Sequence, residues 1–179
     1  MKPPLVALAG ALAFVLVAAP LASAAVDQTE WDAAVAAAQQ VDPSLSPPPN
    51  DPTLMSAVGG GRLETSANTT FGFGATLGPG GLNGQMTHNF FGQTFSATLV
   101  CFEAAGLEDG STIATLIGEL KPNSAMPQPL MVFNVTDGGQ GAQGDAWSVG
   151  FIPEPLGPVS CPPMPGMQAI EGAIAINVP

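Results

Sequence analysis

The chain has no tyrosine, one histidine, two cysteines and only three lysines and arginines among its 179 residues. Of these shortages, the lack of positive charge excludes the largest number of possible partners. The 14 aspartates and glutamates leave a formal net charge of −11. Proteins that bind nucleic acid need a patch of lysine and arginine to neutralise phosphates, and anionic membrane surfaces attract the same basic residues. We therefore expect no nucleic-acid partner and no anionic lipid surface as a partner.

The single histidine, His88, restricts the catalytic possibilities. A Ser-His-Asp arrangement would have to use it as the base, and the chain has no Gly-x-Ser-x-Gly turn to present the serine. A zinc site needs three or four nitrogen or sulfur ligands, which one histidine and a cysteine pair do not supply. Two carboxylates would serve a glycosidase, but the chain has only two tryptophans to line a sugar site. We predict a protein that is not an enzyme, with no catalytic residues and no cofactor.

Residues 1–25 have the order of parts found in a secretory signal peptide. Lys2 supplies a positive start, Leu5 to Leu21 carry no charge, and Ala22-Ser23-Ala24 form a small-x-small cleavage site. The apolar run contains a glycine and a proline and falls short of the ~20 apolar residues of a membrane span, which disfavours the alternative of an uncleaved anchor. We expect a secreted or cell-envelope protein that begins at Ala25 or Val26 and does not insert into the membrane after cleavage.

Cys101 and Cys161 are the only cysteines of the chain. An even pair in an oxidising compartment is most simply a disulfide, whereas a catalytic cysteine needs a thiolate and a nearby base, for which only His88 is available. The alternation of residues 95–101 places Leu99 and Cys101 on the same inward face of a strand. We therefore predict a Cys101–Cys161 disulfide with Cys101 facing inward.

Two short segments precede the main domain. Residues 26–41 are predicted to form an amphipathic helix, with Asp27 as its cap, Glu30 three residues later, and an apolar stripe at helical spacing. The stripe consists of Trp31, Ala34, Val35 and Ala38. Residues 42–56 contain five prolines, three of them consecutive, and are predicted to form a linker, because proline fixes φ and removes a backbone donor.

Residues 57–179 are predicted to be an all-β domain. Apolar residues recur with period two, as in Phe71, Phe73 and Ala75, and glycine and proline separate the segments. Residues 112–118 and 130–135 are apolar on both faces, which is typical of central strands. About eight strands at this spacing favour an antiparallel sandwich or small barrel. Residues 153–166 are too long and proline-rich for a hairpin turn.

A glycine-rich loop, residues 137–145, contains the only metal candidates, Asp137 and Asp145. Two carboxylates eight residues apart would offer oxygen ligands to calcium, but the spacing differs from that of an EF-hand and a third carboxylate is missing. Aspartates next to glycines more commonly bond nearby backbone N–H groups in a turn. We expect a turn and no metal.

Several segments, in order, resemble a family of exported bacterial β-domains, the post-COAP-1 type. The resembling segments are Gly59-Gly60-Gly61, Thr70-Phe71-Gly72-Phe73, Gly84-Gln85, Ala114–Gly118, Asp137–Gly141, Asp145-Ala146-Trp147 and Gly172–Ile176. They cover about residues 57–178. The resemblance implies an all-β fold and an exported context, and it implies no activity and no functional residue.

Two classes of function agree with these observations. The first is a non-enzymatic β-domain that acts as a binding or accessory module, with a partner in the cell wall or envelope. The second is a barrel that holds a small apolar ligand among inward phenylalanine and methionine side chains. A hydrolase is a third and less favoured class, because the acid–base and nucleophile sets are missing. The sequence leaves the ligand and the oligomeric state open.

Overall fold

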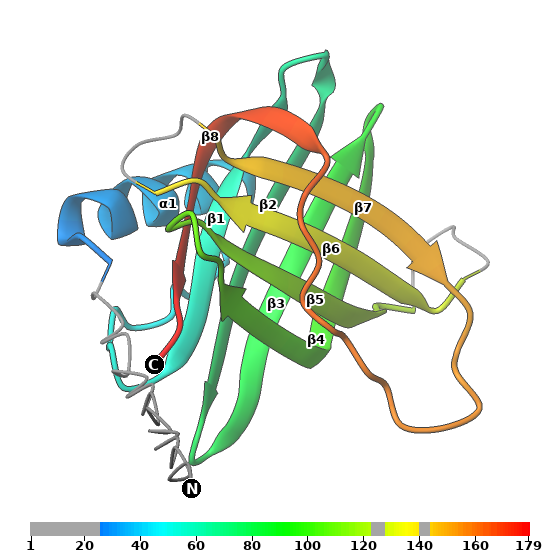
Figure 1. Cartoon of the computed structure of the whole chain (residues 1–179). Helices are drawn as coiled ribbons and strands as arrows, with labels where there is room; N and C mark the ends of the chain where they lie inside the picture. Colours follow the sequence, from blue (N-terminus) through cyan, green and yellow to red (C-terminus); the bar gives the residue numbers. More distant parts are fainter. Residues whose placement is uncertain (1–25, 123–127, 140–143) are drawn as a thin grey trace, which may run out of the picture.

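The structure, a computed structural model, describes residues 26–122, 128–139 and 144–179, so the expected signal peptide lies outside the described residues. One helix precedes eight strands: α1 (Gln28–Val41), β1 (Met55–Leu63), β2 (Ser66–Gly78), β3 (Gly81–Phe90), β4 (Gln93–Gly106), β5 (Thr112–Leu120), β6 (Leu130–Asp137), β7 (Ala146–Ile152) and β8 (Gln168–Asn177). Each strand pairs antiparallel with the next, and β8 returns to β1 to close a barrel in sequence order (Figure 1). The all-β expectation is confirmed, and the barrel is the correct one of the two predicted architectures.

The interior of the barrel is filled by its own side chains. The alternation predicted for β2 places Phe71 and Phe73 inside, where both are fully buried. Phe71 stacks on Trp147 of β7 with ring centroids 4.5 Å apart, and Phe133 of β6 meets the same indole edge-on at 5.2 Å. A barrel of eight strands is just wide enough for such filling, so the centre is an aromatic core.

Helix α1 packs on the outer face of the barrel beside β1 and β8 (Figure 1). The predicted cap is confirmed, because Asp27 Oδ1 accepts a hydrogen bond of 2.7 Å from the Thr29 N–H. Of the predicted stripe, Trp31, Ala34 and Ala38 are buried. The helix approaches closely enough that a Cβ on Gly60 would lie 2.6 Å from the Ala38 backbone, so only glycine fits there.

The proline-rich segment after α1 also lies against the barrel. Leu45 is buried, and a Cβ on Gly74 of β2 would come within 3.2 Å of its side chain. Asp42 Oδ2 accepts a hydrogen bond of 2.8 Å from Thr87 Oγ1 of β3. The helix and the segment that follows it are therefore packed onto the sheet that they precede.

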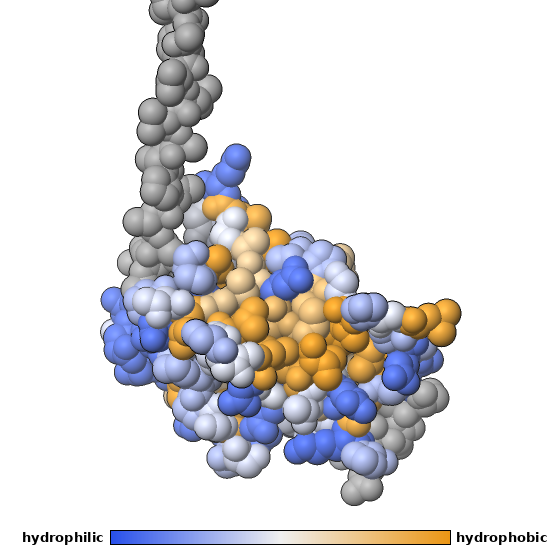
Figure 2. All heavy atoms as spheres, turned by 90° about the horizontal axis from the view of Figure 1, so that it is seen from below, coloured by the Kyte–Doolittle hydropathy of each residue, from blue (hydrophilic) through white to orange (hydrophobic). Residues whose placement is uncertain are grey.

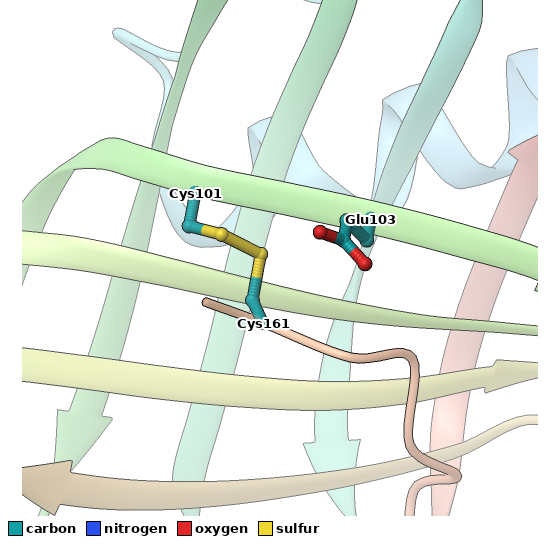
Figure 3. Close-up of side chains that lie close together, drawn as sticks. All are labelled: Cys101, Glu103 and Cys161. Carbon is teal, nitrogen blue, oxygen red and sulfur yellow. A yellow bond between two sulfur atoms is a disulfide. The ribbon is translucent and has the colours of Figure 1, made fainter. Parts of the chain in front are cut away.

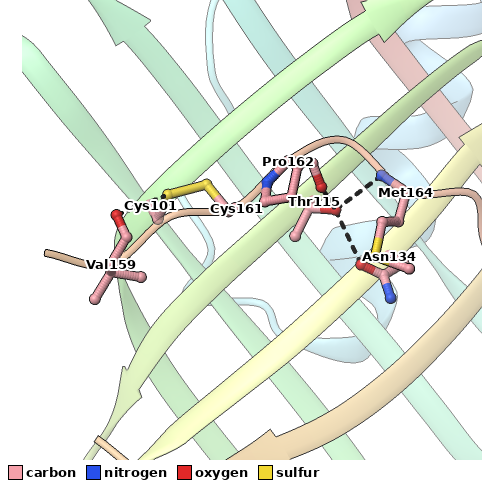
Figure 4. Close-up of a disulfide and its surroundings, with 7 residues drawn as sticks. All are labelled: Cys101, Thr115, Asn134, Val159, Cys161, Pro162 and Met164. Atoms are coloured by element: carbon pink, nitrogen blue, oxygen red, sulfur yellow. Dashed lines mark hydrogen bonds between the residues drawn. A yellow bond between two sulfur atoms is a disulfide. The ribbon is translucent and has the colours of Figure 1, made fainter. Parts of the chain in front are cut away.

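Residues 153–167, which we call the strap, connect β7 to β8 across the outside of the barrel. Cys161 of the strap forms the predicted disulfide with Cys101 of β4. Thr115 Oγ1 of β5 donates to the Pro162 carbonyl at 2.9 Å and accepts from the Met164 N–H at 3.0 Å (Figure 4). The strap covers the outer face of β5, which explains why residues 113–118 are buried on both faces.

The predicted inward direction of Cys101 is wrong. The β4–β5 register shifts between Leu99, opposite Gly118, and Cys101, opposite Ile117, so that Val100 is an extra residue on β4. Such a bulge reverses the alternation after it. Cys101 therefore points outward to the strap, and Phe102, which is 3% exposed, takes the inward position.

Candidate ligand pocket at one end of the barrel

A pocket of about 250 Å³ opens at the end of the barrel where the β1–β2 and β3–β4 turns lie. Its walls come from the ends of β1, β3 and β7 and the start of β2 and β8, which barrel closure brings together. Most of the lining is apolar. The lining residues are Leu63, Thr69, His88, Phe90, Trp147, Val149, Phe151 and Gln168.

Trp147 is the most deeply buried wall of this pocket, with 1% of its surface exposed. Its indole Nε1–H has no hydrogen-bond partner within the described part of the chain. A buried tryptophan N–H usually finds an acceptor, and a buried polar group without one costs about 1–3 kcal/mol. Because Nε1 itself is buried, this donor is not part of the accessible surface of the pocket.

His88 contributes a polar side chain to the lining. Its ring centroid lies 5.2 Å from that of Trp147, and the residue is 3% exposed. Nδ1 lies 3.3 Å from the Thr70 carbonyl oxygen, which only accepts, so Nδ1 carries the proton. Burial lowers the pKa of the imidazole, although the Thr70 bond partly opposes this. The ring is therefore neutral at pH 7, and Nε2 is a hydrogen-bond acceptor.

Exposed aromatic residues form one side of the rim. Phe90, which lines the pocket, is 48% exposed, and Phe91 beside it is 65% exposed. Phe91 and Gly92 form the two-residue β3–β4 turn with φ values of +47° and +81°. This is the primed type of hairpin turn, which favours asparagine and glycine, so a phenylalanine at Phe91 is strained.

The opposite end of the barrel is aliphatic. Met55, Leu77, Leu82 and Val178 come from strand ends that meet there through the β1–β2, β2–β3 and β1–β8 pairings. Figure 2, which views the molecule from this side, shows apolar residues gathered on the surface. Leu77 is 37% exposed, and the other three are partly buried against the core. This end is closed by aliphatic packing, in contrast to the polar groups at the pocket.

A larger cleft of about 530 Å³ lies outside the barrel, between α1 and the outer face of the sheet. Four of its five polar side chains already bond one another in two pairs. Arg62 pairs with Glu171, with Nε 2.7 Å from Oε2, and Asn89 Nδ2 donates to Thr70 Oγ1 at 3.0 Å. The smaller pocket is the better candidate because most of its lining residues are apolar.

The structure gives Asp137 and Asp145 defined roles in the sheet. Each carboxylate accepts one hydrogen bond from its own loop, Asp137 from the Gly139 N–H and Asp145 from the Gly138 N–H. With the other oxygen, Asp145 accepts from the Ile174 N–H at 2.8 Å, and Asp137 from the Ile176 N–H at 3.0 Å. Residues 140–143 of the predicted metal loop lie outside the described residues.

These carboxylates are buried, and this perturbs their ionisation. Burial raises the pKa of Asp145 to about 6, against the lowering effect of its two backbone bonds. Burial likewise raises the pKa of Asp137. The pKa of Glu30 in α1 is raised first by burial and then by the charges of Asp137 and Asp145. The charge of Asp137 therefore acts on Asp145, and the charges of both act on Glu30.

Among the described residues, one group of three potential metal ligands lies within 4.8 Å, and it does not include either aspartate. The group consists of Cys101, Glu103 and Cys161 (Figure 3). Both sulfurs are joined in the disulfide, and metal binding by cysteine requires the thiolate. Glu103 alone would not hold an ion.

Nothing in the sequence predicts that His88 and Trp147 lie together. Their strands are β3 and β7, which are not neighbours in the sheet. The available signal was the shared inward alternation of His88 with Phe90 and of Trp147 with Phe151, and only the closure of the barrel makes them adjacent.

No family model, curated protein or solved structure matches this chain. The resemblance to the post-COAP-1 type therefore stays an expectation. Within the described part of the chain, the single helix is too short to cross a membrane.

Proposed function

We propose that this barrel binds a small, mostly apolar molecule in the pocket at the turn end. The observation that carries the proposal is a mostly apolar pocket at the end of the barrel, with His88 among its few polar lining residues. Ligand sites are typically apolar cavities with a few polar groups that fix orientation. At about 250 Å³ the pocket is below the roughly 300–1,000 Å³ of drug-sized sites, so the ligand is smaller than a drug.

The proposed role is binding without catalysis. Of the lining residues only His88 titrates, and its Nδ1 is already engaged by Thr70. General acid–base or nucleophilic chemistry needs a second positioned group, which the lining does not offer. The barrel is proposed as a carrier or sensor of its ligand.

We also propose that binding takes place outside the cytoplasm. The Cys101–Cys161 disulfide fits an oxidising compartment, and residues 1–25 have the pattern of a signal peptide. Mass spectrometry of the protein from culture supernatant is expected to find an N-terminus at Ala25 or Val26. An intact Met1 would contradict export with cleavage.

Blocking the pocket tests the binding proposal. We expect the ¹⁹F NMR signal of 1-fluoronaphthalene to broaden on addition of the protein, because the bound probe tumbles with the barrel. Val149→Trp fills the pocket and should abolish the broadening. Val100→Trp is the matched control, since Val100 lies on the outer bulge of β4 and is 41% exposed. No broadening with the unsubstituted protein, or equal broadening with both variants, would contradict the proposal.

A further inference from the structure

The second half of β7 has no neighbouring strand on the side away from β6. β8 pairs with β7 only at Ala146 and Trp147, so residues 148–152 pair with β6 alone. Within the described chain, no backbone hydrogen bond from a turn or loop reaches residues 148–152. The strap runs instead across the outer face of β5 (Figure 1). Residues 149–152 are at least partly exposed, so β7 keeps an accessible edge beside the pocket.

The alternation of hydrogen bonds decides which backbone groups lie on this free β7 edge. The Ala169 carbonyl accepts from the β1–β2 turn, so Ala169 bonds toward β1 and its neighbour Gln168 toward β7. Gln168 lies opposite Trp147, which therefore bonds toward β8. Every second residue after Trp147 shares that direction. The N–H and C=O groups of Val149 and Phe151 thus point away from β6 and offer two donors and two acceptors.

We propose that an extended peptide adds to the free β7 edge as a further antiparallel strand, in the place that β8 would occupy if it began earlier. The free groups of Val149 and Phe151 complement those of two peptide residues that have one residue between them. Strand addition of this kind gains affinity from backbone hydrogen bonds and specificity from alternate side chains. The inference goes beyond the proposed function, because it adds a polypeptide partner to the small molecule.

The pocket specifies the side chains of this peptide. Residues opposite Val149 and Phe151 place their side chains on the same face of the sheet as these two residues, which line the pocket. A mostly apolar pocket of about 250 Å³ accepts small apolar side chains there. The residue between them lies opposite Gly150 on the outer face. The net charge of −11 repels an acidic peptide, so the partner is neutral or basic with apolar residues at alternate positions.

A second copy of the chain fits the free β7 edge less well. Thr69 of β2 and Phe90 of β3 form other walls of the same pocket, so the space beside the edge is bounded. A second copy would bring its own β6 together with its β7, whereas a peptide enters as a single strand.

A capped pentapeptide, acetyl-Thr-Val-Thr-Val-Thr-amide, tests the inference on the ¹⁵N-labelled full exported protein. We expect the amide proton signals of Val149 and Phe151 to move downfield, and that of Gly150, which bonds toward β6, to move less. Methylating both valine nitrogens removes two donors and should weaken binding about 25-fold, the value of two net hydrogen bonds. Methylating the central threonine nitrogen is the matched control, because its N–H points away from β7.

A substitution in the protein tests the same edge. Val149→Pro removes one of the two free donors and no bond to β6, since proline is tolerated where a strand N–H faces outward. We expect its affinity for the pentapeptide to be about fivefold lower than that of Val149→Ala, which keeps the N–H.

Three results would overturn the inference. The first is equal affinity for the two methylated peptides. The second is no binding of the pentapeptide by protein that still broadens the 1-fluoronaphthalene signal, which would leave the proposed function standing. The third is a shift of the Val149 and Phe151 signals with protein concentration alone, together with a dimer mass in sedimentation, which would assign the edge to a second copy. Peptide binding without fluoronaphthalene binding would support the inference and contradict only the proposed function.

Discussion

The two edges of β8 are closed in different ways. Toward β1, the backbone pairing is continuous from Asn177 opposite Ser56 to Ile170 opposite Leu63. Toward β7, the described residues form only two pairs, Ala169 with Ala146 and Gln168 with Trp147. Beyond them, the N–H groups of Ile174 and Ile176 are accepted by the carboxylates of Asp145 and Asp137.

The difference shows how side chains can substitute for the carbonyls of a missing strand segment. Backbone N–H groups that are buried need acceptors. A carboxylate has two acceptor oxygens, so each aspartate bonds its own loop and β8 at the same time, which an asparagine, with one acceptor oxygen, would not do. The cost is burial of charge, visible in the raised pKa values of both groups.

Removing the disulfide should have the largest effect on stability, and it should act mainly on the edge of β8 that faces β7. Cys101→Ala together with Cys161→Ala is expected to lower the free energy of unfolding by ~2–5 kcal/mol. The strap leads directly into β8, so hydrogen exchange should speed up more at the Ile174 and Ile176 amides than at β8 amides bonded to β1. Chemical denaturation and exchange measure the two effects. Free thiols in the native exported protein would contradict the disulfide itself.

Asp145→Ala should come next in size. It leaves the Ile174 and Gly138 N–H groups without their acceptor, and we expect a loss of about 1–3 kcal/mol in the free energy of unfolding. Asp145→Asn should lower the free energy of unfolding by a smaller amount, because the asparagine keeps one acceptor oxygen. Asp109→Ala is the control, since Asp109 accepts only from Ser111 in an exposed turn and should change stability by under about 0.5 kcal/mol. Equal effects of the two alanine variants would contradict a special role for the carboxylate edge.

The pH dependence should have a defined sign. The pKa of Asp145 is about 6 in the folded protein against an ordinary value of 3.8, so the folded state binds this proton more tightly. Its contribution to stability is then greatest below the ordinary value and declines as pH rises through about 6. The lowered pKa of His88 acts in the opposite direction as pH falls below 6.5. The difference in melting temperature between the unsubstituted protein and Asp145→Asn, followed over this interval, isolates the aspartate, and a difference independent of pH would contradict the assignment.

We expect calcium to leave the melting temperature unchanged. Both carboxylates are engaged with backbone N–H groups, and we predict that they do so without an ion. A calcium site would stabilise the fold by ~2.7 kcal/mol at a hundredfold excess over the dissociation constant. The melting temperature is measured with added calcium and again with a chelator, and the two values are compared. A higher melting temperature with calcium would show that the edge is closed by a metal.

Local sequence determined the helix and the alternation of strands. Asp27 and the Trp31, Ala34, Ala38 spacing specify α1 because capping and helical period act over a few residues. The period of two in Phe71, Phe73 and Ala75 specifies β2 in the same way. The disulfide was predicted because the chain has an even number of cysteines and an expected oxidising compartment.

Tertiary structure alone decided the bulge at Val100, the barrel closure and the pocket. Residues 99–102 are all apolar, so no polar residue marks where the alternation reverses. The acceptors of Ile174 and Ile176 lie about thirty to forty residues away along the chain, and Trp147 meets His88 only across the closed barrel. Pairing between distant segments depends on the packing of the whole domain, whereas period and capping depend on neighbours in sequence.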